Sequence, residues 1–145
     1  MNEIDVKMFT GRTEARLMKV RYDVLPIAMN TTVNIANEDE IVITRVDDRA
    51  VAFEVTRNIV VNPKSLFEIS ATCYLRRSIG DQFQDLVSLK DIDIQKFVSE
   101  HMAELTNIAF CNLAYIFGSI TGSFGGTPLL TPPAPMKNTI ISVKR

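Results

Sequence analysis

Apolar and polar residues alternate along two long stretches in the first half of the chain, which is the two-residue period of a β-strand. From Val51 to Val61 one face carries Phe53, Val55, Arg57, Ile59 and Val61. The same alternation runs from Leu66 to Arg76. Asn62-Pro63-Lys64-Ser65 between them is rich in turn-forming residues, so the two stretches predict a β-hairpin.

Three shorter alternating segments precede this hairpin, at Lys19 to Val24, Thr32 to Ile35 and Glu40 to Val46. The acidic run Glu38-Asp39-Glu40 is expected to be a solvated turn. Strands with one apolar and one polar face are typical of an antiparallel sheet that is buried on one side and wet on the other.

The period changes from two residues to a helical one after Gly80. One helix is predicted from about Ile94 to Leu105, capped by Asp91 or Asp93, and a second from Ile108 to about Thr121, capped by Asn107. Strands first and helices last predict an α+β fold. We expect an antiparallel sheet of four or slightly more strands, followed by a short and a long helix packed on one face. Asn138 to Val143 is either an edge strand or a frayed end.

The second predicted helix is apolar nearly all round, with Asn112 as the lone polar residue between Ile108 and Phe117. A helix of this kind is normally buried on both sides. With a single sheet available to cover one side, the other side is expected to contact a second copy of the chain. The residues predicted for this oligomer interface are Ile108, Cys111, Tyr115, Ile116 and Ile120.

A Gly- and Pro-rich loop from Gly118 to Pro135 follows this helix and keeps large apolar side chains, although loops are usually polar. Its glycines are expected to end the helix through left-handed dihedrals, and its prolines to hold the chain extended. The apolar groups of helix and loop either complete the core or bind another chain, and both interpretations stay open. The predicted binding residues are Phe110, Leu113, Phe117, Phe124, Leu129 and Leu130.

Composition and charge narrow the possible partners. The chain has 145 residues and a net charge of −1, which fits one domain and gives no basic face for nucleic acid. No apolar run approaches the roughly 18 residues of a membrane span. The amino terminus carries acids where a signal peptide would carry basic residues, so we expect a cytoplasmic protein. Cys73 and Cys111 are both expected to be buried thiols.

Residues that could perform catalysis are sparse. His101 is the only histidine and lies on the apolar stripe of the first predicted helix, where a partly buried core residue is the simplest interpretation. One histidine and two distant cysteines make a poor zinc set, and the acidic clusters lack the spacing of a calcium loop. The sequence predicts no catalytic residue, metal or cofactor.

Residues 15–135 resemble the SecB family of protein-export chaperones. Asn107-Ile108 matches the start of the family's long helix, and Ile120 and Gly122-Ser-Phe124 match its Ile-Thr and Gly-Thr-Phe positions. Leu130 and Pro132 match the Leu-Ala-Pro loop that follows. The resemblance implies an ATP-independent holdase, a dimer of dimers, that holds unfolded or precursor polypeptides in apolar grooves without ATP or metal.

The chain departs from the family pattern after Pro135, where residues 136–145 form a short tail in place of a second helix and an acidic or metal-binding tail. The acids that dock the SecA motor are not recognisable either. The expected client is therefore either an export precursor passed to SecA or a dedicated protein, such as the antitoxin of a toxin–antitoxin system.

Two other functions remain open. A hotdog-like thioesterase or small-ligand binder would use Asp91, Asp93 or His101 as its base, although that fold usually places its helix before most of its strands. A non-catalytic adaptor subunit would use the apolar helix for oligomerisation alone.

Overall fold

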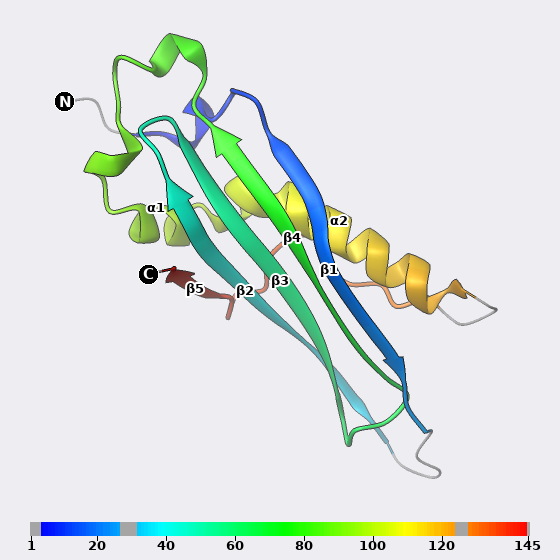
Figure 1. The fold of residues 1–145 in the computed structure, drawn as a ribbon. Helices are drawn as coiled ribbons and strands as arrows, with labels where there is room; N and C mark the ends of the chain where they lie inside the picture. Colours follow the sequence, from blue (N-terminus) through cyan, green and yellow to red (C-terminus); the bar gives the residue numbers. More distant parts are fainter. Residues whose placement is uncertain (1–3, 27–31, 124–127, 145) are drawn as a thin grey trace.

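The computed structural model describes residues 4–26, 32–123 and 128–144, and in this part of the chain it confirms the predicted α+β fold. A sheet with the strand order β1-β4-β3-β2-β5 is covered on one face by helices (Figure 1). The strands are β1 (Glu14–Val24), β2 (Asn34–Val46), β3 (Ala50–Asn62), β4 (Phe67–Ser78) and β5 (Ile140–Val143). Three short 3₁₀ turns, at Val6–Met8, Asp81–Phe83 and Leu89–Asp91, precede the helices.

The β3–β4 hairpin forms the middle of the sheet, as its alternating pattern predicts. Phe53 pairs with Leu75, Val55 with Cys73 and Ile59 with Ile69, all in antiparallel register. Because residues directly opposite each other point to the same side of a sheet, these apolar side chains share one face. We call it the inner face; it lies toward the helices. The opposite, outer face carries polar side chains such as Thr56 and Thr72, whose hydroxyls hydrogen-bond at 2.8 Å.

Two strands are longer than the sequence pattern predicts. β1 begins at Glu14 rather than Lys19, and it changes register between Leu17 and Lys19. β2 is one continuous strand, so the expected turn at Glu38-Asp39-Glu40 is wrong. The reason is residue-by-residue pairing with β3: Glu38 faces Asn58 on the outer side, and Asp39 faces Arg57 on the inner side.

The break between the two helices also differs from the prediction. Helix α1 spans Ile94–Glu100 and is capped by Asp93, whose carboxylate accepts from the Lys96 backbone N–H at 3.2 Å. Helix α2 spans Met102–Thr121, so the chain breaks at His101 and not before Asn107. Asn107 instead lies exposed in mid-helix.

Helix α2 packs on the inner face, mainly against β4. Its inward side contributes Leu105, Ala109, Phe110, Leu113 and Phe117, all 0% exposed, to a core that continues onto the sheet. The predicted alternation of buried and wet strand faces is therefore confirmed.

Beyond α2 the chain turns back along the inner face, beside the helix, and reaches β5 next to β2 (Figure 1). We call residues 128–139 the strap. β5 pairs parallel to β2, with Ile140 opposite Glu40 and Val143 opposite Ile43. The expected edge strand at the end of the chain is thus present, and the strap carries the chain across the sheet to it.

The end of α2 fits closely against the beginning of the strap. Gly122 has φ −83°, so this glycine is not left-handed as expected; Gly125 and Gly126 lie outside the described residues. A Cβ added to Gly122 would come within 2.8 Å of Pro128 Cγ, whereas one on Gly118 would meet nothing closer than 3.6 Å. Close packing, and not backbone conformation, therefore favours glycine at position 122.

Alanine at these two glycines should have opposite effects. Gly122→Ala is expected to lower the free energy of unfolding by about 1–3 kcal/mol, because it overpacks the contact with Pro128. Gly118→Ala should raise it by about 0.5–1 kcal/mol, because Gly118 is helical and has room for a methyl group. Urea unfolding of the two variants checks this. Equal effects at both positions would contradict the close contact.

Candidate functional site

Three of the predicted binding residues lie inside the protomer. Phe110, Leu113 and Phe117 are each 0% exposed and pack between α2 and the sheet. In this structure they belong to the core and offer no surface to another chain.

The strap holds two of the other predicted binding residues, Leu129 and Leu130. Leu129 is half-buried against the core, and its backbone N–H donates to Thr121 Oγ1 at 2.7 Å. Leu130 is 86% exposed and points away from the core. Phe124 lies outside the described residues. Leu130 is therefore the predicted binding residue that has a free apolar surface in the protomer.

The residues predicted for an oligomer interface divide between two surroundings. Ile108 and Tyr115 are 42% and 76% exposed, and Cys111 is exposed too, so the expectation that Cys111 is a buried thiol is wrong. Ile108 and Tyr115 are seven residues apart, which places them on the same side of α2. Ile116 and Ile120 are half-buried against the core. The outward side of α2 is thus open in the protomer and carries large apolar groups.

Further apolar side chains are exposed on β1, the edge strand at the opposite end of the sheet from β5. They are Leu17, Met18, Tyr22 and Val24, with exposed fractions of 48%, 49%, 36% and 75%. Leu17 pairs with Cys73 and Val24 with Phe67, so both lie on the inner face. An edge strand also has a row of backbone groups with no neighbouring strand. The β1 edge therefore combines apolar side chains with main-chain donors and acceptors.

The most extensive polar contact in the core joins Arg57 of β3 to Asp39 of β2. Both side chains are 0% exposed, and the guanidinium holds the carboxylate through Nε to Oδ1 at 2.7 Å and Nη2 to Oδ2 at 2.8 Å. The guanidinium also lies 4.9 Å from the centre of the Phe110 ring on α2. A buried charge needs a partner of this kind, because its desolvation cost is otherwise several kcal/mol.

This ion pair also holds the strap. Arg57 donates to Thr131 Oγ1 at 3.0 Å, to the Pro132 carbonyl, and to the Ala134 carbonyl at 2.9 Å. Asp39 Oδ2 accepts from the Met136 backbone N–H at 3.0 Å. The five N–H donors of a guanidinium are thereby all used.

The local sequence pattern gives only part of this cluster. It places Arg57 on the apolar face of β3, an unusual position for a cation, but it does not show what neutralises the charge. Asp39 lies two and four residues before Ile41 and Ile43, and residues two apart in a strand share a face. A continuous β2 would therefore have placed Asp39 on the inner face. The contacts with the strap join residues 74 to 97 positions apart, a separation at which no local pattern operates.

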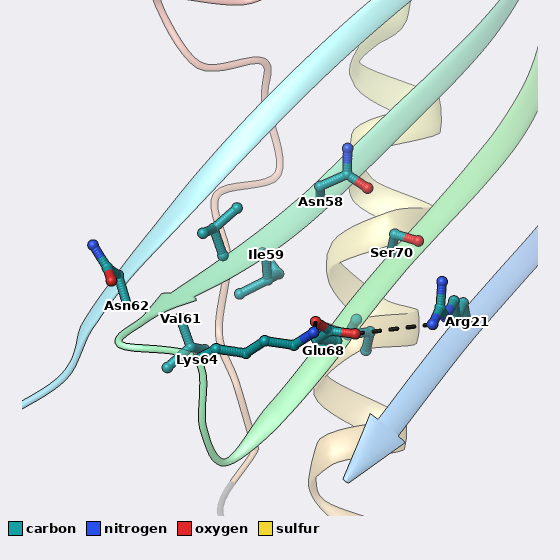
Figure 2. A pocket seen from close by; sticks show the side chains of 10 residues that line it. Arg21, Asn58, Ile59, Val61, Asn62, Lys64, Glu68 and Ser70 are labelled. Atoms are coloured by element: carbon teal, nitrogen blue, oxygen red, sulfur yellow. Dashed lines mark ion pairs between the residues drawn. The ribbon is translucent and has the colours of Figure 1, made fainter. Parts of the chain in front are cut away.

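A shallow hollow of about 450 Å³ lies at the hairpin end of the sheet (Figure 2). Its charged side chains are already paired: Lys64 contacts Glu68 at 2.7 Å, and Glu68 contacts Arg21 at 3.9 Å. These side chains are 36–72% exposed, and exposed pairs of this kind contribute little energy. The hollow contains no group arranged for acid–base or nucleophilic chemistry.

Titratable groups elsewhere form no catalytic arrangement in the part of the chain that the structure describes. His101 is half-buried and packs against Phe97, with ring centres 4.7 Å apart and the rings tilted by 45°, as expected for a core histidine. Burial raises the pKa of the Cys73 thiol, which keeps it protonated and unreactive. Within residues 4–26, 32–123 and 128–144, no three His, Cys, Asp or Glu side chains are grouped to hold a metal ion. No helix among these residues has the length and apolar character needed to cross a membrane.

Neither a protein-family model nor a curated protein matches the chain. Among solved structures, the fold is similar to that of the Mycobacterium tuberculosis SecB-like chaperone Rv1957 in complex with a ChAD peptide from the Rv1956 HigA1 antitoxin. The TM-score is 0.60 at 11% sequence identity, and the match covers 83% of this chain and 90% of that one. The chain therefore has a fold similar to that of a SecB-like chaperone.

Proposed function

We propose that this protein is a cytoplasmic, ATP-independent chaperone that binds unfolded polypeptides through exposed apolar side chains. The observation that carries the proposal is the set of large apolar groups left outside a well-packed core, with Leu130 at 86%, Tyr115 at 76% and Val24 at 75% exposed. Exposed apolar groups of this size are typical of interaction surfaces when they gather in patches. The similarity to a chaperone solved with a bound peptide supports the same proposal.

Such a surface needs no catalytic residue to act. An unfolded chain exposes the apolar side chains that folding would bury, and each buried square ångström is worth about 25 cal/mol. Several weak contacts along one chain add up through multivalency. A protein that binds the unfolded state in this way holds its client back from aggregation without using ATP.

We also propose that the protein is a homo-oligomer, with the outward side of α2 as an interface between copies. Ile108 and Tyr115 are exposed there on an apolar helix, and Cys111 lies beside them. A dimer of dimers would cover these groups. The strap and the inner-face side of β1 would remain available for a client.

The proposed client is an unfolded polypeptide with apolar segments. An antitoxin is the client class that the structural neighbour favours, since that chaperone was solved with an antitoxin peptide. A precursor passed to the SecA motor is the other client class. Titration with peptides from either source distinguishes them.

A substitution at Leu130 tests the proposal. Leu130→Asp should raise the dissociation constant for reduced, carboxymethylated α-lactalbumin by roughly tenfold, because the contact of one leucine is worth about 1.5–3 kcal/mol. The fold should not change, since Leu130 packs against nothing in the core. Fluorescence anisotropy measures the affinity, and far-UV circular dichroism checks the fold.

Asn138→Asp is the matched control, because it adds the same charge to an exposed position of the strap without removing an apolar group. It should leave the affinity unchanged. Light scattering of an aggregating client, with and without the wild-type protein, tests the function itself. If the wild-type protein forms a stable oligomer but neither binds the unfolded probe nor suppresses aggregation, it is an assembly subunit and the chaperone proposal fails.

A further inference from the structure

The strap is held on the inner face mainly through its main chain. Two of its four contacts with the Asp39–Arg57 pair are carbonyls, at Pro132 and Ala134, and a third is the Met136 N–H. The hydroxyl of Thr131 is the one side-chain contact among the four. The pair therefore recognises polypeptide backbone more than any particular sequence.

The contacts come from alternate residues of the strap, at positions 132, 134 and 136, and the chain bends at Pro133 and Ala134 between them. Pro132, Pro133 and Pro135 have no N–H, which leaves the carbonyls as the groups that the strap offers at those positions. Arg57 donates to the carbonyls of Pro132 and Ala134, and Asp39 accepts from the N–H of Met136.

The surroundings of the strap, which we call its seat, include residues of α2 and β2. One side is α2, where Cys111 Sγ lies 3.6 Å from the Pro133 carbonyl, and the floor includes Asn37 of β2, whose amide lies 3.9 Å from Met136 Sδ. Arg57, stacked near Phe110, stands between them. β5 then continues the same path, attached to β2 over the four paired residues 140–143.

We propose that the seat is a polypeptide-binding site, that the strap of the same protomer occupies it in the free protein, and that a client segment displaces the strap. The incoming chain is an apolar segment whose own carbonyls and N–H take over the contacts of Pro132, Ala134 and Met136. This inference rests on the proposed chaperone function and deepens it. It assigns Arg57 and Asp39 as the residues that position the bound backbone. In the free protein the strap itself blocks this seat.

A disulfide between strap and helix tests the proposal. Pro133→Cys places a thiol beside Cys111, and oxidation would tie the strap to α2. The oxidised variant should bind reduced, carboxymethylated α-lactalbumin at least tenfold more weakly than the same variant after reduction. Wild-type protein and Pro133→Ser should bind equally well under both conditions, and counting free thiols establishes that the bond has formed.

Equal binding by the tied and reduced forms would overturn the displacement of the strap while leaving the chaperone function in place. Absence of binding by wild-type protein would instead remove the proposed function, and this inference with it. The two failures are thereby distinguishable in one set of measurements.

Hydrogen exchange on the wild-type protein gives a second readout that needs no disulfide. On saturation with the same unfolded probe, the amides of residues 136–143 should exchange several-fold faster, because they lose Asp39 and β2 as partners. The amides of the β3–β4 hairpin should keep their protection. Unchanged or slower exchange at residues 136–143 in the bound state would overturn the proposal.

Discussion

Arg57→Met is expected to lower the free energy of unfolding by about 3–5 kcal/mol. The substitution leaves the Asp39 carboxylate buried, with a side chain 0% exposed and without its cation. It also removes the donors for the Pro132 and Ala134 carbonyls, so the strap loses its attachment to β3. Urea unfolding followed by circular dichroism measures the effect.

Arg45→Met is the matched control, because Arg45 also pairs with an aspartate, Asp47, but with 76% of its side chain exposed. It should change stability by less than about 1 kcal/mol. The double variant Asp39→Leu/Arg57→Met should be less destabilised than the sum of its two single variants, since it removes both charges together. Additive effects would show that the two charges do not depend on each other.

Phe117→Ala should likewise lower the free energy of unfolding by about 3–5 kcal/mol, whereas Tyr115→Ala should change it by less than about 0.5 kcal/mol. Phe117 is 0% exposed between α2 and the sheet, so its removal leaves a cavity. Tyr115, two residues earlier on the same helix, is 76% exposed and leaves none. Both variants are compared by urea unfolding at low protein concentration, where oligomers dissociate.

The same pair of variants separates packing from association. If the outward side of α2 contacts another copy, Tyr115→Ala should shift the oligomer to smaller species at high concentration, as measured by sizing with light scattering. A large loss of protomer stability in Tyr115→Ala with none in Phe117→Ala would mean that α2 is turned the other way on the sheet.

Periodicity predicted the sheet well because its strands bury one face only. Local sequence alone predicts the hairpin turn at Asn62-Pro63-Lys64-Ser65 and the set of residues that form the apolar face of β3 and β4. The break between the helices did not, because Asn107 is a good cap in isolation. Thr106 is fully buried and donates to the Met102 carbonyl at 2.6 Å, so tertiary packing continues the helix through this position.

The candidate site was predicted less well than the fold, for a physical reason. Helical spacing shows that Phe110, Leu113 and Phe117 share a side with each other, but not which side of α2 meets the sheet. That choice depends on long-range packing of α2, mainly against β4. The Asp39–Arg57 pair depends on strand register, and its contacts with the strap depend on the path of the chain after α2.

The strap comes late in the sequence, and this has a consequence for synthesis on the ribosome. Strands β1 to β4 all lie before residue 79, whereas the segment that reaches Asp39 and Arg57 follows about a hundred residues after β2 begins. Chains emerge from the ribosome amino terminus first, at roughly 5–20 residues per second. A nascent sheet therefore waits several seconds with Arg57 lacking the Pro132 and Ala134 carbonyls, and these contacts form only after the strap has been synthesised.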